Sequence, residues 1–200
     1  MSSTTWVHRA ARIAIRPLVT TGITPNHITT LRLATGLAAA AAFAVGERTW
    51  EIVGGVLFVV SAFLDRADGE LARVSGRTSS LGHRYDVASD ATCTTVTFAA
   101  IGIGLSKGAL GGSALLMGIV AAIAVAALFW LTQRLENAGE PIGGIDGFDP
   151  DDALFIVGPA AWFGGLKLLL YAAATAAPLC LVLLLLRYRN TLARPVGRIR

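Results

Sequence analysis

The chain has few charged residues and few cysteines, and these shortages exclude several classes of protein. Only 15% of its 200 residues are charged, whereas 54% are hydrophobic. Soluble domains carry about a quarter charged residues, so an ordinary soluble fold is excluded. Cys93 and Cys180 lack metal-ligand spacing and lie in apolar stretches, which excludes a zinc site and a disulfide framework. No nucleic-acid recognition motif is present, so the net charge of +4 does not indicate nucleic-acid binding.

Long apolar stretches with few charges predict an all-α integral membrane protein. We expect a single membrane domain over residues 1–200, because the chain has no room for a second one. Its core would be a bundle of six transmembrane helices within residues 26–187, followed by a basic tail at 188–200. The helices are expected at about 26–46, 50–73, 82–106, 109–133, 151–164 and 167–187. The fifth is short for a spanning helix, and Gly164–Gly165 separates it from the sixth.

The N-terminal segment, about residues 4–21, predicts an amphipathic helix that lies on the membrane surface. Its apolar side chains fall on one side of a helix, and Arg9, Arg12 and Arg16 fall on another. No long apolar region precedes a small-residue cleavage site, so we do not expect a cleavable signal peptide.

The distribution of arginine predicts the orientation of the chain. The N-terminal segment, the polar turn at 74–81, Arg134 and the tail at 188–200 would share one side of the membrane. The positive-inside rule then places both termini in the cytoplasm. We expect the membrane to be a bacterial inner membrane, with the aspartate cleft open to the cytoplasm. These basic ends would contact anionic membrane lipids.

Four aspartates lie within or at the ends of the predicted spans: Asp65, Asp68, Asp86 and Asp90. A carboxylate at membrane depth costs about 2.5 kcal/mol or more unless it pairs or binds a cation. Two antiparallel helices joined by the turn at 74–81 would present two carboxylates each to one cleft. Carboxylate oxygens suit Mg²⁺, Mn²⁺ or Ca²⁺ rather than zinc. Four of them can hold two ions about 3.5–4 Å apart, an arrangement used for displacement at phosphorus.

Small residues share the faces that carry these aspartates. Gly69 and Ala72 follow Asp65 at i+4 and i+7, and Gly82 lies one turn before Asp86. They remove side-chain bulk from the cleft, so that a bulky ligand can approach the helix backbone closely.

The aspartates and small residues fit the pattern Asp-x2-Asp-Gly-x2-Ala-Arg-x8-Gly-x3-Asp-x3-Asp at every fixed position: Asp65, Asp68, Gly69, Ala72, Arg73, Gly82, Asp86 and Asp90. Through this pattern the chain resembles the CDP-alcohol phosphotransferase family. Residues 24–32, Thr-Pro-Asn-His-Ile-Thr-Thr-Leu-Arg, also resemble the Pro-Asn-x-x-Thr-x-x-Arg opening of the first membrane helix in many bacterial members. The loop at 139–152 and the tail match no feature of the family.

The resemblance implies a membrane enzyme of phospholipid biosynthesis. An acceptor alcohol attacks the CDP-linked phosphate of a CDP-alcohol, most often CDP-diacylglycerol, and CMP leaves. Asp65, Asp68, Asp86 and Asp90 would hold two ions, Mg²⁺ or Mn²⁺. Asp90, the last carboxylate on its face, is the expected catalytic base. Members of the family are often homodimers, which the sequence neither supports nor opposes.

The resemblance also implies that the signature stretch helps to hold the cytidine diphosphate. Gly69, Ala72 and Arg73 would form its cradle, and Asn26 would contribute from the first membrane helix. An arginine fork suits a diphosphate. Arg73 at a helix end also fits a side chain that reaches to the interface, and Asn26 also fits a helix cap.

The sequence does not decide between two chemical classes of acceptor alcohol. Arg77, Arg84 and Arg134 lie on the predicted cytoplasmic side and favour an acceptor that carries phosphate. Asp151 and Asp152, where the acidic loop at 139–152 meets the start of the fifth predicted helix, favour an acceptor that carries an amine, such as serine. The same two acids also suit the positive end of a helix dipole.

A different function class stays as the alternative. Intramembrane acids also occur in cation and proton transport proteins. Transport would explain the aspartates, but it would not explain Arg73, the glycines or the position of the cluster at the cytoplasmic edge.

Overall fold

The computed structural model describes residues 13, 15–19, 21–140 and 154–192. In this part of the chain all regular structure is helical, which confirms the all-α class. The elements are η1 (Arg16–Leu18), α2 (Pro25–Val45), α3 (Arg48–Ser75), α4 (Ser80–Ser106), α5 (Gly112–Asn137), α6 (Val157–Trp162) and α7 (Leu166–Leu192). The predicted amphipathic helix over 4–21 lies mostly outside the described residues.

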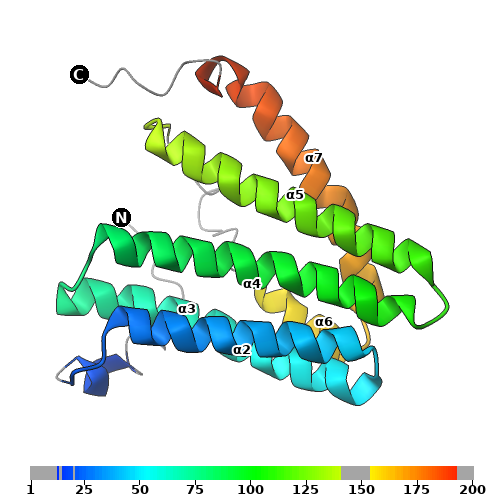
Figure 1. The fold of residues 1–200 in the computed structure, drawn as a ribbon, viewed down its shortest axis with the longest axis horizontal. Coiled ribbons are helices and arrows are strands. Elements are labelled where there is room, and N and C mark those ends of the chain that lie inside the picture. The colour runs from blue at the N-terminus through cyan, green and yellow to red at the C-terminus, as the bar shows by residue number, and fades with distance from the viewer. Residues whose placement is uncertain (1–12, 14, 20, 141–153, 193–200) are drawn as a thin grey trace.

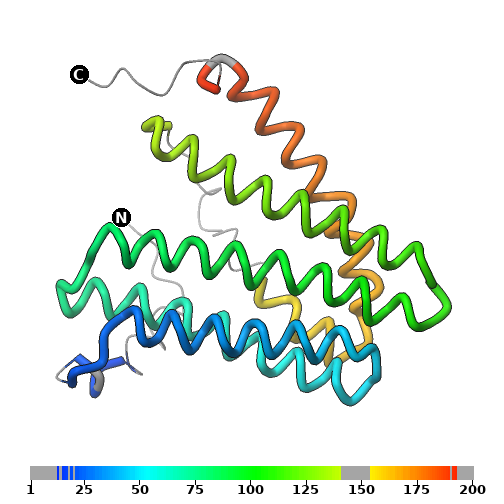
Figure 2. Tube along the Cα trace, viewed as in Figure 1, coloured from blue at the N-terminus to red at the C-terminus, as the bar shows by residue number. Residues whose placement is uncertain are grey.

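The long helices form a bundle in which α2 packs against both helices that carry the aspartates. Helix α2 contacts α3 and α4, α6 packs on α3, α5 packs on α4, and α7 packs on α5 (Figure 1). The Cα trace in Figure 2 shows that the start of α2, the end of α3 and the start of α4 lie at the same end of the bundle. The aspartate pattern therefore lies at one end of the molecule.

Four described helices are long and apolar enough to cross a membrane: α2, α4, α5 and the Leu166–Arg189 part of α7. Large apolar side chains point outward from α5 and α7, including Leu116, Ile123 and Leu168, with exposed fractions of 63%, 65% and 74%. Helix faces of this kind are suited to lipid contact.

Helix α3 has 28 residues and is about 42 Å long, but it is not among these four. Its second half carries Asp65, Arg66, Asp68 and Glu70, which lower its apolar character. Of these, Arg66, Asp68 and Glu70 are buried. Helix α3 packs on α2 and on α6.

The predicted fifth spanning helix, at 151–164, is not confirmed. In its place the structure has α6, whose six residues extend about 9 Å. A hydrocarbon core is about 30 Å thick, so α6 alone does not cross it. The Arg48 guanidinium donates to the Ala161 and Trp162 carbonyls at the end of α6. The predicted break at Gly164 is present, with φ of 76° in the left-handed region that glycine favours.

The predicted turn between the aspartate helices is shorter than expected. Helix α3 continues to Ser75, and α4 begins at Ser80. The Ser79 hydroxyl caps α4 by accepting a hydrogen bond of 2.9 Å from the Gly82 backbone N–H. The sixth predicted helix is longer than expected, because α7 continues past 187 to Leu192, with non-helical backbone angles at Tyr188.

Close helix packing beside the aspartates depends on Gly36 of α2. A Cβ added there would lie 2.5 Å from Cys93 Sγ on α4 and 3.0 Å from Ser61 Oγ on α3. Small residues allow membrane helices to approach closely. Gly36 therefore lets α2 contact both aspartate helices one turn away from Arg32.

Candidate active site

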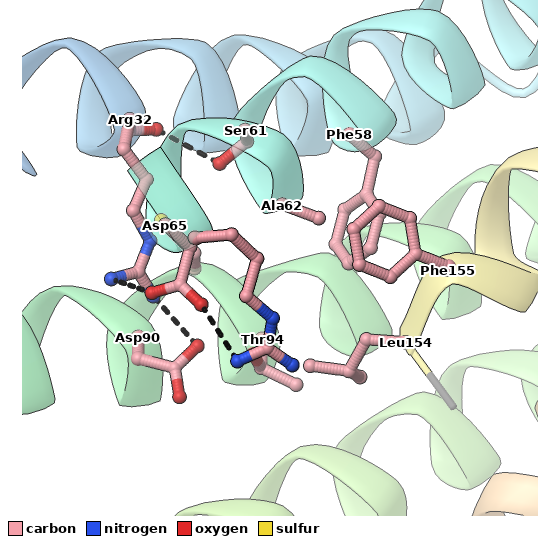
Figure 3. Close-up of a pocket in the computed structure, with 11 residues that line it drawn as sticks. Arg32, Phe58, Ser61, Ala62, Asp65, Asp90, Thr94, Leu154 and Phe155 are labelled. Atoms are coloured by element: carbon pink, nitrogen blue, oxygen red, sulfur yellow. Dashed lines mark hydrogen bonds and ion pairs between the residues drawn. The ribbon is translucent and has the colours of Figure 1, made fainter. Parts of the chain in front are cut away.

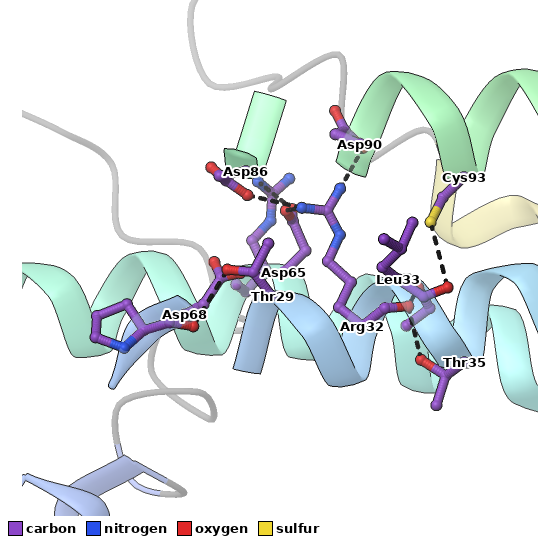
Figure 4. A network of polar contacts seen from close by, with 12 residues as sticks. Thr29, Arg32, Leu33, Thr35, Asp65, Asp68, Asp86, Asp90 and Cys93 are labelled. Atoms are coloured by element: carbon purple, nitrogen blue, oxygen red, sulfur yellow. Dashed lines mark hydrogen bonds and ion pairs between the residues drawn. The ribbon is translucent and has the colours of Figure 1, made fainter. Parts of the chain in front are cut away.

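Arg32 reaches from α2 to both aspartate helices (Figure 4). Its Nη1 lies 2.6 Å from Asp65 Oδ1 and 2.7 Å from Asp86 Oδ1, and its Nη2 lies 2.7 Å from Asp90 Oδ1. Only 1% of the residue is exposed. A guanidinium with two donor nitrogens suits this geometry because its fork matches carboxylate oxygens on different helices. Arg32 therefore fixes three of the four predicted carboxylates.

Three aspartates form the cluster that could hold a metal ion. Asp65, Asp68 and Asp86 each place one carboxylate oxygen within 4.8 Å of the others. The Thr29 hydroxyl donates a hydrogen bond of 2.8 Å to Asp68 Oδ2, which orients that carboxylate. Asp90 is not in this group of three, although Arg32 connects it to Asp65 and Asp86.

The donor set of this cluster fits a divalent cation. It consists of carboxylate oxygens alone, the ligands that Mg²⁺, Mn²⁺ and Ca²⁺ prefer. Two members of this cluster, Asp65 and Asp86, also contact the Arg32 guanidinium, at 2.6 and 2.7 Å. Arg32 and Arg66 offset half of the charge of the four aspartates, so net negative charge remains for a metal.

A pocket lies beside the aspartates, between α3, α4 and the residues that precede α6. Figure 3 shows Arg32, Asp65 and Asp90 on one side of it and three apolar side chains on the other. Its lining residues are Arg32, Phe58, Ser61, Ala62, Asp65, Arg66, Asp90, Cys93, Thr94, Leu154 and Phe155. Asp90 thus borders both the Arg32 network and this pocket, a position that suits a base acting on a bound hydroxyl.

The predicted nucleotide cradle leaves an open helix face. A Cβ added at Gly69 would meet only Arg73 Nη2, at 3.8 Å, within 4 Å. The Arg73 side chain is 61% exposed, and its Nη2 lies 3.1 Å from Glu70 Oε1. Ala72 is partly buried next to them. This face can therefore admit a ligand close to the backbone of α3.

Asn26 lies beside the start of α4. The N-cap of α2 is Thr24 and its first residue is Pro25. The alternative role considered for Asn26, that of a helix cap, is therefore wrong. A Cβ added at Gly82 would lie 3.0 Å from Asn26 Oδ1. The absence of a side chain at Gly82 therefore lets Asn26 lie one turn from Asp86.

The predicted acceptor residues do not meet at one place in the described structure. Arg77 Nη1 donates to the Ile23 carbonyl at 3.3 Å, and Arg84 is exposed. The Arg134 guanidinium lies 5.3 Å from the centre of the Trp130 ring. None of these three arginines lines the pocket beside Asp90. Asp151 and Asp152 lie outside the described residues.

The sequence placed Thr29 and Arg32 at fixed positions of the opening that resembles the family's first membrane helix, but it predicted no contact between either residue and the aspartates. A signal was present, because Thr29, Arg32 and Gly36 recur at i, i+3 and i+7 and so share one face of α2. An arginine within a predicted span also needs an acidic partner. The identity of that partner, however, depends on contacts between residues far apart in the sequence.

The fold and the aspartate cluster define an integral membrane protein with a site suited to a divalent cation. Residues 22–194 match the sequence profile of CDP-alcohol phosphatidyltransferase. Because this match covers most of the chain, the protein belongs to the CDP-alcohol phosphatidyltransferase family. Members of this family depend on divalent metal, in agreement with the aspartate cluster. Membership agrees with the family resemblance that the aspartate pattern indicated.

Two known proteins illustrate the similarity. Over 95 residues the chain is 34% identical to archaetidylinositol phosphate synthase of Pyrococcus horikoshii, an alignment that spans 48% of this chain and 47% of that protein. The chain thus matches about half the length of that relative. The fold is similar to the crystal structure of Mycobacterium tuberculosis phosphatidylinositol phosphate synthase (PgsA1) with CDP-DAG bound. The TM-score is 0.70 at 20% identity, over 96% of this chain and 99% of that one.

Proposed function

We propose that the protein transfers the substituted phosphate of CDP-diacylglycerol to an acceptor alcohol and releases CMP. The observation that carries this proposal is the cluster of Asp65, Asp68 and Asp86, set at the family's spacing and joined to Asp90 through Arg32. The similar mycobacterial synthase has CDP-DAG bound, which supports this donor over other CDP-alcohols. Family membership favours phosphotransfer over the cation or proton transport hypothesis.

Asp65, Asp68 and Asp86 are proposed to hold two ions, Mg²⁺ or Mn²⁺, with Asp90 sharing one of them. Thr29 keeps Asp68 oriented for this task. When bound, such ions neutralise a diphosphate and stabilise the leaving CMP.

Asp90 is proposed to take the proton of the acceptor hydroxyl. It borders the pocket whose opposite side is lined by Phe58, Leu154 and Phe155. Arg32 holds Asp90 Oδ1 at 2.7 Å and so keeps the carboxylate in place.

The CDP group is proposed to lie over the open face of α3. Gly69 and Ala72 would admit it close to the helix backbone, and Arg73 would pair with its phosphates. Asn26 would approach it from the start of α2. The exposure of Arg73 supports this role, since its guanidinium can rearrange around a ligand.

Two acceptor sites follow from the sequence. One uses Arg77, Arg84 and Arg134 and takes a phosphate-bearing alcohol; the other uses Asp151 and Asp152 and takes an amine. The names of both similar proteins contain inositol phosphate, which supports a phosphate-bearing acceptor.

The proposed setting is a bacterial inner membrane, with the active site and both chain termini in the cytoplasm. This orientation follows from the arginines near the aspartate end, such as Arg77 and Arg84. A single domain with six membrane-embedded helices and an N-terminal surface helix remains the proposed architecture. A homodimer would be compatible with it.

The direct test is an acceptor panel. The purified protein is supplied with CDP-diacylglycerol and Mn²⁺, together with inositol 1-phosphate, glycerol 3-phosphate, inositol, glycerol or serine. We expect CMP release and a new phospholipid in equal amounts with a phosphate-bearing alcohol. Failure of every acceptor, with this donor and with other CDP-alcohols, would contradict the proposal. Cation and proton flux into proteoliposomes would then test the transport alternative.

A further inference from the structure

Glu70 is a buried acid inside the aspartate pattern, and the mechanism above gives it no task. It stands at a variable position of the pattern, directly after Gly69 and three residues before Arg73. Only 2% of the residue is exposed. It is not a member of the aspartate group that could hold a metal ion. A buried carboxylate is costly unless it is paired with a positive charge, so its pairing is informative.

Glu70 and Arg73 form an ion pair within α3. Arg73 Nη2 lies 3.1 Å from Glu70 Oε1, and positions i and i+3 are neighbours on a helix surface. The two side chains differ in exposure, since that of Glu70 is 2% exposed and that of Arg73 is 61% exposed. The pair therefore joins a carboxylate fixed by burial to a guanidinium that a ligand can reach.

The ion pair places the guanidinium beside the open face of α3. Gly69 precedes Arg73 by four residues, so the two residues share one face of the helix. A Cβ added at Gly69 would lie 3.8 Å from Arg73 Nη2, the same nitrogen that contacts Glu70. This is the face over which the CDP group is proposed to lie. A guanidinium has five N–H donors, so its contact with Glu70 is compatible with further hydrogen bonds to a diphosphate.

We propose that Glu70 is a positioning residue that holds Arg73 ready for the diphosphate of the CDP-alcohol. This inference rests on the proposed phosphotransfer function and deepens its donor site. An arginine side chain has many rotamers, and ordering it upon binding lowers affinity. Glu70 reduces this cost because it holds the guanidinium next to Gly69 before the donor binds. Glu70 acts through Arg73 and does not itself contact the donor.

Charge repulsion alone predicts the opposite effect. A carboxylate near the donor site repels an anionic diphosphate, so on that basis neutralising Glu70 would strengthen donor binding. Positioning predicts that the same change weakens donor binding, because Arg73 loses its anchor. A role in packing alone would change the thermal unfolding temperature without depending on Arg73. The direction of the change in donor affinity and its dependence on Arg73 therefore separate these roles.

The kinetic experiment measures the donor KM of the wild type and of Glu70→Gln. CMP release is followed at varied CDP-diacylglycerol, with Mn²⁺ and the most active acceptor alcohol in excess. Glu70→Gln should raise the donor KM about 2- to 12-fold, the range for ordering one long side chain, and leave the acceptor KM unchanged. Glu51→Gln is the matched control, because Glu51 forms an i,i+3 ion pair with Arg48 at the opposite end of α3. Its donor KM should equal that of the wild type.

The double variant Glu70→Gln/Arg73→Gln tests whether Glu70 acts through Arg73. Arg73→Gln removes the proposed contact with the diphosphate and should raise the donor KM about 10- to 150-fold. In that background Glu70→Gln should cause no further rise, so the two effects should not be additive. Glu70→Asp keeps the charge but shortens the side chain, so it should also raise the donor KM. It serves as the test if Glu70→Gln does not fold.

A binding measurement separates positioning from the chemical step. CDP or cytidine is added together with Mn²⁺, and the rise in thermal unfolding temperature is measured. CDP should give a smaller rise with Glu70→Gln than with the wild type or Glu51→Gln. Cytidine lacks the diphosphate, so its effect should be the same in all three proteins.

Three results would overturn the inference and leave the proposed function intact. The first is a donor KM in Glu70→Gln, or in Glu70→Asp where that variant replaces it, that is unchanged or lower than in the wild type. The second is a rise of the same size in the Arg73→Gln background, and the third is an equal loss of CDP and cytidine binding. Absence of CMP release from the wild type with every acceptor would overturn the proposed function, and the inference with it.

Discussion

The guanidinium of Arg32 lies 2.6 Å from the carboxylate of Asp65, and this contact joins α2 to the helix that begins the aspartate pattern. The same guanidinium also reaches Asp86 and Asp90 on α4, so one side chain connects three helices. These contacts lie among residues that the resemblance assigns to metal binding. The arrangement therefore couples the packing of the bundle to the geometry of the site.

Replacement of Arg32 should damage both stability and activity. Removing one partner from a buried ion pair costs about 3–5 kcal/mol, because the remaining charges lose compensation. We expect Arg32→Gln to lower the thermal unfolding temperature in detergent and to reduce CMP release. The double variant Arg32→Gln/Asp90→Asn should lose less stability than the sum of the single changes, since Asp90 no longer needs a cation. If Arg32→Gln unfolded at the same temperature as the wild type, the stabilising role of the Arg32 contacts would be contradicted.

Asp90→Asn should separate binding from chemistry. Loss of a general base lowers turnover by a factor of about 100 to 10,000. Because Asp65, Asp68 and Asp86 remain, the variant should still bind CDP-diacylglycerol in the presence of Mn²⁺. Asp68→Asn, in contrast, should weaken donor binding as well. Donor binding and single-turnover CMP release would be measured on the same samples, and normal turnover by Asp90→Asn would mean that the proton goes to another group.

Two glycines offer a matched pair of alanine substitutions. A Cβ at Gly36 would lie 2.5 Å from Cys93 Sγ, so Gly36→Ala should cost about 1–3 kcal/mol through overpacking. Gly69 has open space around it, so Gly69→Ala should leave stability unchanged but raise the KM of CDP-diacylglycerol. Thermal unfolding and donor kinetics test both. Adding Cys93→Ala to Gly36→Ala should restore part of the lost stability, and no recovery would argue against this contact.

Helical periodicity explains why much of the site was predictable. The spacing of Asp65 and Asp68 on one helix, and of Asp86 and Asp90 on the next, fixes which side chains share a face. A short turn between the two helices then places the end of one near the start of the next, and α2 packs against both. The structure brings Asp65, Asp68 and Asp86 together as this reasoning requires.

The remaining features depend on contacts that local patterns do not contain. The pairing of Arg32 with Asp65 joins residues on different helices. Hydropathy detects an apolar segment but does not determine its path, so the short α6 was predicted as a spanning helix. Positive charge on one side of the membrane likewise does not specify depth. The acceptor role of Arg77, Arg84 and Arg134 therefore stays a prediction, although none of them lines the pocket beside Asp90.

The central claim is that the aspartate cluster acts through bound divalent metal in CDP-alcohol phosphotransfer. Its most direct test is acceptor-dependent CMP release from CDP-diacylglycerol by the purified protein, measured first in EDTA and then after addition of excess Mg²⁺ or Mn²⁺. The account predicts that chelation abolishes CMP release and that either ion restores it, because the carboxylates of Asp65, Asp68 and Asp86 alone cannot neutralise a diphosphate. Full CMP release in EDTA would contradict the account.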